Sequence, residues 1–301
     1  MTGTEFTRDT DYVSTRITRD GRDGYPVEPG RYRLIAARAC PWANRAIIVR
    51  RLLGLEDVLS MGLCGPTHDE RSWTFDLDPG GVDPVLKIPR LQDANVKRIP
   101  GYDRGITVPA IVDIPTGAVV TNDYPQMTLD LSTQWKAYHR PGAPDLYPER
   151  LREEIDVVAR RVYTEVNNGV YRCGFAGSQE AYEQAYVRLF HGLDWLEERL
   201  SGRRYLVGDM ITEADVLYAP GLRTAEEIRA VVEATSKPIN VLALRGMTLD
   251  LITGAGAQRV SVGGGLTWTA VSAMVDAAKA IRDDGDFSDL GRPTEFHQWL
   301  D

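Results

Sequence analysis

The chain has 301 residues, of which 43% are apolar and 26% charged, the composition of a soluble globular protein with room for two domains. Its formal net charge of −8 argues against a nucleic-acid partner, because such a partner favours a basic face. No apolar run reaches the roughly 20 residues that a membrane span needs. The polar N-terminus lacks a signal peptide's apolar core, so we expect a cytoplasmic protein without a membrane partner.

Three cysteines and four histidines are the residues from which a disulfide framework or a metal site would be built. Cys40, Cys64 and Cys173 are too few and too scattered for either. The histidines show no metal-ligand spacing, so no metal is expected and each is interpreted as an ordinary surface or core residue. They are His68, His139, His191 and His297.

The first 54 residues predict an arm, a strand and a helix. Residues 1–29 are rich in Asp, Arg, Gly and Thr and are expected to form an N-terminal arm with little core of its own. Residues 31–37 predict a strand, which leads into Cys40-Pro41-Trp42-Ala43. The apolar spacing that follows predicts a helix over residues 42–53, which Gly54 ends.

Cys40 is expected at or next to the N-cap of this helix, with Pro41 at its first position. The free N–H groups and the positive dipole end of the helix would lower the pKa of the thiol. Arg38 and Arg45 flank the cysteine and are expected to act in the same direction. The alternative is a buried structural cysteine, the commonest role of a lone one; the helix start and the arginines favour a reactive thiol.

A second strand is predicted over residues 58–63, ended by Cys64 and a Gly-Pro turn. Residues 65–105 are rich in Pro, Gly and Asp and show little periodicity. We expect a long insertion without regular structure, which inside a compact domain is usually functional. Trp73 and Phe75 within it are expected to pack back over the domain.

A hairpin follows the insertion. Residues 105–113 predict a strand with Pro109 at the head of its apolar run, a position where proline is allowed. Pro115-Thr116-Gly117 predicts a turn, and residues 118–121 return as the partner strand.

Asp123, next to Asn122, is expected to cap a helix that begins near Tyr124. The order strand, helix, strand, loop, strand, strand, helix is that of a thioredoxin-like domain, here residues 30–135. In that fold a cis proline stands opposite the cysteine that starts the first helix. Val108-Pro109 is the proline bond in the corresponding place.

Residues 145–213 predict a second, helical domain after a Pro-rich linker. The apolar residues of its two helices recur at helical spacing and are interpreted first of all as core. In the first helix they are Leu151, Ile155, Val158, Val162 and Val166. In the second, capped by Ser178, they are Tyr182, Tyr186, Leu189, Leu193, Leu196 and Leu200.

Five phrases, occurring in a fixed order, resemble the glutathionyl-hydroquinone reductases, the Xi-class glutathione transferases. The resemblance covers roughly residues 10–215. The phrases are Cys40-Pro41-Trp42-Ala43, Thr107-Val108-Pro109, Thr121-Asn122-Asp123, Glu165-Val166-Asn167-Asn168-Gly169-Val170-Tyr171 and Tyr205-Leu206-Val207-Gly208-Asp209.

The resemblance implies a glutathione-dependent thiol transfer in which Cys40 is catalytic and glutathione is the co-substrate. Cys40 would attack the sulfur of a glutathionyl-hydroquinone, a small aromatic thioether, and form a mixed disulfide that a second glutathione resolves. Ala43 fits this, since a second cysteine there would resolve the disulfide internally. The resemblance also allows a homodimer.

The same resemblance implies the residues that hold the ligands. Glutathione would contact Trp42, Val108, Pro109, Asp123 and Tyr124, and the aromatic substrate would contact Tyr171. The family usually has Glu-Ser where this chain has Asp123-Tyr124, so the contact with a glutathione carboxylate departs from the pattern. A purely structural role in the core is the alternative for Tyr171.

Thr212-Glu213-Ala214-Asp215 predicts a capping box, which in glutathione transferases opens a central helix. Pro220-Gly221 follows too soon for a long helix, and residues 214–219 can also be interpreted as a short buried strand. Beyond them, helices are predicted over 224–235, 247–252 and 268–281, and strands over 238–244 and 259–262. This alternation is typical of parallel β/α units.

Residues 214–286 resemble the last three β/α units of the isocitrate lyase and phosphoenolpyruvate mutase superfamily. The phrases are Ala214-Asp215-Val216-Leu217-Tyr218-Ala219-Pro220-Gly221, Lys237-Pro238-Ile239-Asn240-Val241 and Arg259-Val260-Ser261-Val262-Gly263-Gly264. Eight-stranded barrels do not close with three strands.

We therefore expect an α/β chimera: a thioredoxin-like domain, a truncated helical transferase domain over 145–213 and a partial β/α barrel over 214–301. A divergent transferase with an unusual last third is the alternative organisation. The alternatives for function are a mutase-like lyase, whose anion site would be Gly263–Gly265, and an inactive fusion. Residues 216–301 are expected to be the least stable part.

Overall fold

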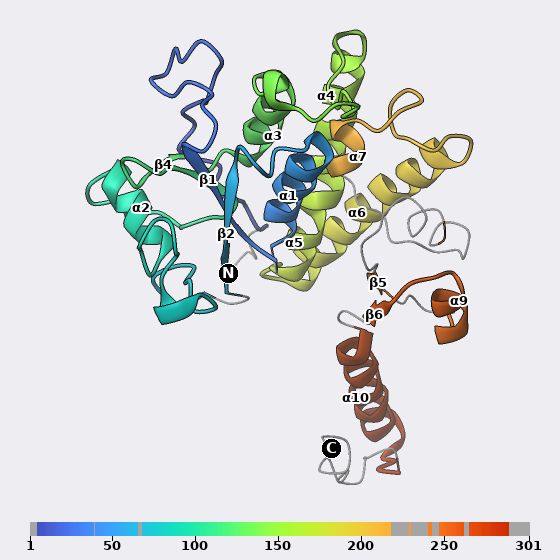
Figure 1. Ribbon diagram of the computed structural model, residues 1–301. Helices are drawn as coiled ribbons and strands as arrows, with labels where there is room; N and C mark the ends of the chain where they lie inside the picture. The colour runs from blue at the N-terminus through green and yellow to red at the C-terminus, as the bar shows by residue number, and fades with distance from the viewer. Residues whose placement is uncertain are drawn as a thin grey trace. The chain divides into compact units, whose positions relative to one another are not determined.

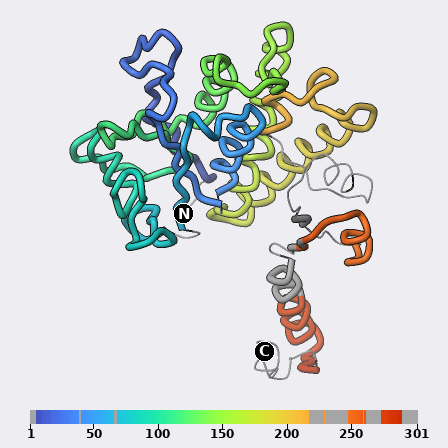
Figure 2. The backbone as a smooth tube through the Cα atoms, viewed as in Figure 1, coloured from blue at the N-terminus to red at the C-terminus, as the bar shows by residue number. Residues whose placement is uncertain are grey.

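The computed structural model describes residues 5–38, 40–65, 68–217, 229, 240–242, 247–261 and 265–288. The chain divides into two compact units, residues 1–219 and residues 220–301, and Figure 2 follows its path by residue number. Among the described helices, none is long and apolar enough to cross a membrane.

A four-stranded sheet with three helices forms the start of the first unit, as the sequence predicts. The sheet order is β2-β1-β3-β4, with β1 parallel to β2 and antiparallel to β3, and β3 antiparallel to β4. This confirms the thioredoxin-like order of elements. The elements are β1 (Tyr32–Ala37), α1 (Pro41–Leu53), β2 (Ser60–Cys64), α2 (Leu91–Arg98), β3 (Ala110–Asp113), β4 (Ala118–Thr121) and α3 (Tyr124–Thr133).

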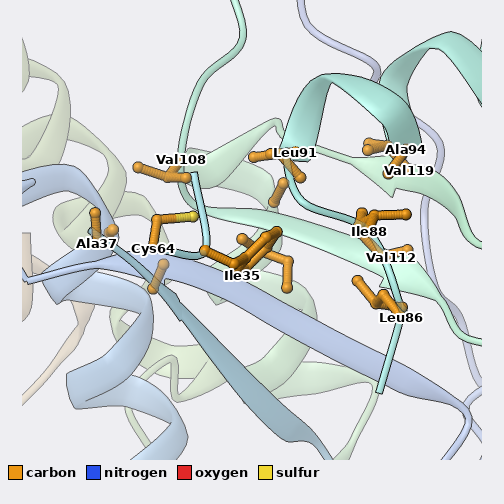
Figure 3. Packing of buried hydrophobic residues seen from close by; sticks show 14 of the residues in the cluster. Ile35, Ala37, Cys64, Leu86, Ile88, Leu91, Ala94, Val108, Val112 and Val119 are labelled. Carbon is orange, nitrogen blue, oxygen red and sulfur yellow. The ribbon is translucent and has the colours of Figure 1, made fainter. Parts of the chain in front are cut away.

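The two faces of the sheet carry two hydrophobic cores, because successive side chains of a strand point to opposite faces. On one face Leu34 and Ile111 pack with Leu53 of α1 and Leu131 of α3. On the other, Ile35, Val112 and Val119 pack with Leu91 and Ala94 of α2. Figure 3 shows this second core, which also encloses Cys64, and Figure 1 shows α2 on the opposite side of the sheet from α1 and α3.

The start of α1 is as predicted. Cys40 is the N-cap residue, Pro41 is at the first helical position, and Gly54 ends the helix in the left-handed conformation at φ 71°. Glycine suits that position because it has no Cβ to clash. The Val108-Pro109 bond is cis, as the thioredoxin-like order led us to expect.

The expectation that residues 65–105 lack regular structure is wrong for part of the segment. It contains α2 and a short 3-10 turn, η1 (Pro79–Gly81). Only Leu91, Ala94 and Asn95 of α2 are buried, so its apolar stripe is too short to give a clear period. Phe75 is fully buried and Trp73 packs on the same core, as predicted.

The expectation that the N-terminal arm has little core is also wrong. Val13 and Ile17 are buried, one in each core of the sheet. Asn122 fixes the arm through its side-chain oxygen, which accepts from the Val13 N–H at 2.7 Å, and through its own N–H, which donates to the Val13 carbonyl at 3.1 Å. Arg16 pairs with the buried Asp130 of α3.

The helical part of the first unit follows two short 3-10 turns, and the predicted helix starting at Leu151 is interrupted. An α-helix over residues 152–161 is followed by a π-helical turn over residues 162–167. Ser178 caps the next long helix and accepts from the Ala181 N–H, as predicted. The elements are η2 (Lys136–Tyr138), η3 (Glu149–Leu151), α4 (Arg152–Arg161), η4 (Val162–Asn167), α5 (Gly169–Gly174) and α6 (Gln179–Leu200).

The stretch at the join is helical: α7 spans Glu213–Leu217. Its interpretation as a strand is therefore wrong for residues 214–217. One half of the predicted capping box is present, because the Asp215 carboxylate accepts from the N–H of Thr212, and it also accepts from the Thr212 hydroxyl. Ala214 belongs to the core of the helical part and Val216 to the core beneath α1 and α3. α7 therefore lies within the first unit, which ends at Ala219.

In the second unit, two short strands pair in parallel, β5 (Asn240–Leu242) with β6 (Arg259–Ser261). They are accompanied by α9 (Leu249–Gly254) and α10 (Gly265–Asp284). Two of the three predicted β/α units therefore have a strand in the described residues. An incomplete barrel of three β/α units is not seen there. The predicted helix over 224–235 and most of Gly263–Gly265 lie outside the described residues.

Candidate functional site

Cys40 lies where the N-terminus of α1 meets the loop that carries the cis proline. Its thiol donates to the Val108 carbonyl, with 3.5 Å between sulfur and oxygen. Cys40 is partly buried, Cys64 is buried, and all three cysteines are free thiols. The geometry therefore brings together Cys40, Val108 and Pro109, three of the residues that the sequence singles out.

The prediction of a lowered pKa for Cys40 is wrong. Burial raises the pKa of the Cys40 thiol, and this effect exceeds the opposing effects of the Ala43 and Trp42 N–H groups and of the Arg8 charge. The helix start therefore does act as expected, but it offsets only part of the cost of burying a thiolate. A ligand that adds hydrogen bonds to the sulfur would act in the same direction as the helix.

The charge near Cys40 comes from a different arginine than the sequence suggests. Arg38 is exposed, and Arg45 is directed to α7, where its Nη2 donates to the buried Glu213 at 2.8 Å. The Ser132 hydroxyl donates to the same carboxylate at 2.7 Å. Arg45 thus joins α1 to α3 and α7, and Arg8 of the N-terminal arm supplies the charge that acts on the thiol.

Asp123 and Tyr124, the next two predicted residues, begin α3. Asp123 is the N-cap and accepts from the Gln126 N–H. Burial raises the pKa of its carboxyl, an effect that the Gln126 N–H partly offsets. The Tyr124 ring is buried against Trp42, with centroids 4.8 Å apart. Tyr124 therefore contributes a wall beneath Trp42, and any contact with glutathione would come from its backbone.

Trp42 and Tyr171 are brought together although 129 positions separate them. The indole Nε1–H of Trp42 donates to the Tyr171 hydroxyl at 2.9 Å. Their rings stack with centroids 5.9 Å apart, and Tyr171 also stacks on Phe6 of the arm and on Phe175. Because its oxygen accepts from Trp42, the Tyr171 O–H is oriented to donate elsewhere.

Arg8 lies over the same aromatic rings. Its guanidinium carbon is 4.3 Å from the Tyr171 ring centroid and 4.7 Å from that of Trp42. Its Nε donates to the Asn168 side-chain oxygen at 2.7 Å, and the Asn168 amide donates to the Tyr163 carbonyl at 3.1 Å. A guanidinium over aromatic faces is favourable because the ring quadrupole attracts it.

The π-helical turn η4 explains how Asn168 and Tyr171 come to face this site. An i→i+5 turn inserts one extra residue into a helix and re-aims the side chains that follow, and such turns are frequent at functional sites. Asn168 ends the turn, and α5 then carries Tyr171.

A pocket of about 260 Å³ opens beside these aromatic residues. It lies between one face of α1 and the segment η4–α5, and α7 contributes to its wall. Its lining is mostly apolar, as is usual for a site that accepts an aromatic group. The lining includes Trp42, Ile48, Val166, Val170, Tyr171 and Val216.

No role is predicted from the sequence for three residues of this site, namely Arg8, Phe6 and Asn168. An arginine and a phenylalanine in a polar arm give no periodic signal. The phrase Asn167-Asn168-Gly169 does carry a local signal, because Asn and Gly inside a helical pattern indicate an irregular turn.

Two family models match parts of the chain. The model for the glutathione S-transferase C-terminal domain matches residues 179–230. The model for phosphoenolpyruvate phosphomutase matches residues 212–282. The two matches overlap over residues 212–230, a range that includes the boundary between the units after residue 219.

Comparisons with curated proteins find relatives over about two thirds of the chain. The glutathionyl-hydroquinone reductase PcpF of Sphingobium chlorophenolicum is 42% identical over 214 residues, 68% of this chain and 66% of that protein. The reductase YqjG of Escherichia coli is 36% identical over 223 residues, 71% of this chain and 68% of that protein. The chain therefore spans about two thirds of the length of these relatives.

Solved structures agree with this comparison. The crystal structure of a glutathione transferase from Gordonia bronchialis is 76% identical, with a TM-score of 0.68, over 69% of this chain and 64% of that one. The glutathione-bound structure of Escherichia coli YqjG is 36% identical, with a TM-score of 0.63, over 67% of this chain and 68% of that one.

Proposed function

The chain belongs to the glutathionyl-hydroquinone reductase family, the Xi-class glutathione transferases, and from this we propose that it releases hydroquinones from their glutathione conjugates. Cys40 is the nucleophile and glutathione the co-substrate. The observation that carries the proposal is the placement of Cys40 at the N-cap of α1, beside cis-Pro109 and close to an aromatic pocket.

The first step needs a thiolate and a leaving group that can accept an electron pair. A ring hydroxyl of the conjugate loses its proton, and a proton adds to the ring carbon that bears sulfur, which gives a dienone. The Cys40 thiolate then attacks that sulfur, the S–S bond forms, and the carbon–sulfur bond breaks. Its electron pair returns to the ring oxygen as a phenolate, which takes up a proton.

The second step regenerates the enzyme. A glutathione thiolate attacks the glutathione sulfur of the Cys40 mixed disulfide, which forms oxidised glutathione and frees Cys40. A thiol from solution is needed because Ala43, 0% exposed, occupies the place of an internal resolving cysteine.

The loop and helix starts around Cys40 supply the groups that would hold glutathione. The Val108 main chain, next to the thiol, would pair with the cysteinyl part in the manner of a strand. The N-terminus of α3 would hold a carboxylate, since the positive end of a helix dipole favours an anion there. Asp123 would hold the amine, and Trp42 would pack beside the sulfur.

The aromatic group would occupy the pocket beside Trp42 and Tyr171. Its apolar lining favours a ring, and the Tyr171 O–H is a donor for a ring oxygen. The arm, residues 30–135 and the helices after residue 145 all contribute residues to this site, and all of them belong to the first unit.

For the second unit we propose that it is a piece of a phosphoenolpyruvate phosphomutase-like chain joined to the transferase part. The family match over residues 212–282 and the parallel pairing of β5 with β6 support this. The chain is then a fusion in which the chemistry resides in the first unit.

The test is the release of hydroquinone from a glutathionyl-hydroquinone in the presence of added glutathione. We expect turnover by the parent and a loss of at least about a thousandfold in Cys40→Ser, since the step depends on the nucleophile. Cys173→Ser is the matched control and should keep the parent's rate. No release by the parent, with Cys40 still alkylated readily, would mean that the fusion is inactive.

A further inference from the structure

We propose that Arg8 of the N-terminal arm is the binding residue for the phenolate oxygen of the aromatic substrate, and that it makes the site selective for conjugates of phenols. The inference rests on the proposed function, because it assigns a role in the same site. Arg8 carries a positive charge that takes no part in the steps proposed above.

The Arg8 guanidinium has no partner of opposite charge. Among the residues that the structure describes, no carboxylate forms an ion pair with it, whereas Arg16 on the same arm pairs with Asp130. The Nη2 atom of Arg8 is buried and meets no hydrogen-bond acceptor. A buried donor without an acceptor is costly, so such a group at a site indicates a ligand that supplies the acceptor.

Arg8 is held rather than free to turn toward solvent. Its Nε is fixed by Asn168, which is itself 5% exposed and anchored to the main chain of η4. The arm that carries Arg8 is fixed by the pairing of Val13 with Asn122. The charge is thus in place before a ligand arrives, which is the condition under which electrostatic stabilisation is most effective.

The neighbours of Arg8 identify the chemical class of the ligand. The guanidinium lies over Tyr171 and Trp42, which are two of the residues that line the aromatic pocket. An anion bound there is attached to a ring, and in the proposed reaction the ring oxygen carries negative charge when its hydroxyl is deprotonated and again when the bond to sulfur breaks. A planar guanidinium suits such an oxygen because it presents several donors in one plane.

Phe6 now occupies a place on this stack. Its ring stacks on Tyr171 with centroids 6.1 Å apart, and the Arg8 guanidinium carbon is 5.8 Å from its centroid. Phe6 therefore packs beside both Arg8 and the Tyr171 ring.

The experiment compares two substrates of the same nucleophile. One is a glutathionyl-hydroquinone, and the other is the mixed disulfide of glutathione with 2-mercaptoethanol, whose leaving group has no ring. The readout is the ratio of their kcat/KM values, because an effect on Cys40 itself changes both. For Arg8→Gln we expect this ratio to fall about a hundredfold, as for the loss of one preorganised donor.

Arg19→Gln is the matched control, because it removes one charge from an exposed side chain of the same arm, and its ratio should equal that of the parent. An unchanged ratio in Arg8→Gln overturns the proposal, whether both activities fall together or neither falls. Near-ultraviolet circular dichroism of the variant checks that the aromatic cluster is intact.

A binding measurement separates this proposal from the proposed function. The visible absorption of 4-nitrophenol reports its ionised fraction, so titration with the protein measures the binding of the phenolate without turnover. We expect Arg8→Gln to bind the phenolate at least about tenfold more weakly than the parent and Arg19→Gln. Equal affinities, or no binding by the parent, overturn the assignment of Arg8 even if hydroquinone release is observed.

Discussion

The two units of the chain differ in how far the apolar side chains of their helices and strands are buried. In residues 5–217 three hydrophobic cores bury both faces of the sheet and the inner faces of the helices. Among residues 220–301, where burial is described for residues 229, 247–258, 260 and 273–288, the buried apolar residues are Ile252, Ala255, Ala257 and Ala277. Met274 and Val275 of α10 are 66% and 40% exposed, although their spacing predicts a buried stripe.

The difference shows that a family-like sequence pattern does not by itself provide a core. Parallel strands are normally covered on both faces, and their neighbours in a barrel supply that cover. The described pair β5–β6 has one neighbour each. The first unit keeps the partners that its elements need, including α7, whose two ends belong to different cores.

Limited proteolysis tests this comparison with the largest expected effect. We expect the first cuts to fall after residue 217, about a hundredfold faster than cuts within residues 5–217, because proteases act on segments that open locally. The measurement is a time course with the fragments identified by mass. A first cut within α1 or α6 would contradict the comparison.

Glu213→Ala tests whether α7 is an integral part of the first unit. It leaves the buried Arg45 guanidinium without its counter-charge and the Ser132 hydroxyl without its acceptor. We expect the free energy of unfolding, measured in urea, to fall by about 3–5 kcal/mol. Asp276→Ala on the exposed face of α10 is the control and should change it by less than about 0.5 kcal/mol.

A pair of core truncations sharpens the comparison further. Leu131→Ala removes a fully buried side chain from the core beneath α1 and α3 and should cost about 2–5 kcal/mol. Met274→Ala removes a side chain that is 66% exposed and should change stability little. Equal losses in the two variants, measured as shifts of the denaturation midpoint, would mean that α10 is covered as well as α3.

The smallest effect concerns the pH dependence of Cys40. Because burial raises the pKa of this thiol, its thiolate fraction at a given pH is lowered, and its alkylation should increase with pH up to a midpoint above that of an ordinary cysteine. Arg8→Gln should move the midpoint higher still, since the Arg8 charge lowers the pKa. Peptide-resolved alkylation by iodoacetamide across pH gives both midpoints. A downward shift in the variant would contradict the argument.

Local patterns were sufficient to predict much of the first unit. The N-cap at Cys40, the stop at Gly54 and the cap at Ser178 follow from residue types whose backbone preferences are strong. The cis bond at Pro109 was expected from the order of the elements, because the bond before a proline is usually trans. The helix α2 was missed because only one turn of it is buried. The strand predicted over residues 214–219 was wrong for residues 214–217 because their apolar run fits a helix as well as a strand.

The candidate site was predictable only in part, for a physical reason. The sequence identifies residues whose role depends on their own helix or loop, such as Cys40 and Asp123. It does not reveal long-range pairings, such as Arg8 with Asn168 or Arg45 with Glu213, because these depend on tertiary packing. The prediction of a lowered pKa for Cys40 failed for the same reason. The burial of the thiol depends on tertiary packing, which brings the Val108 carbonyl against its sulfur.

The most direct test of the account is the covalent intermediate on Cys40. The protein is mixed with a glutathionyl-hydroquinone in the absence of free glutathione, and the intact mass and cysteine-containing peptides are measured after a rapid acid quench. The account predicts one added glutathionyl group, located on Cys40, that disappears when glutathione is added. An unmodified protein, or a glutathionyl group on Cys64 or Cys173 instead, would contradict it.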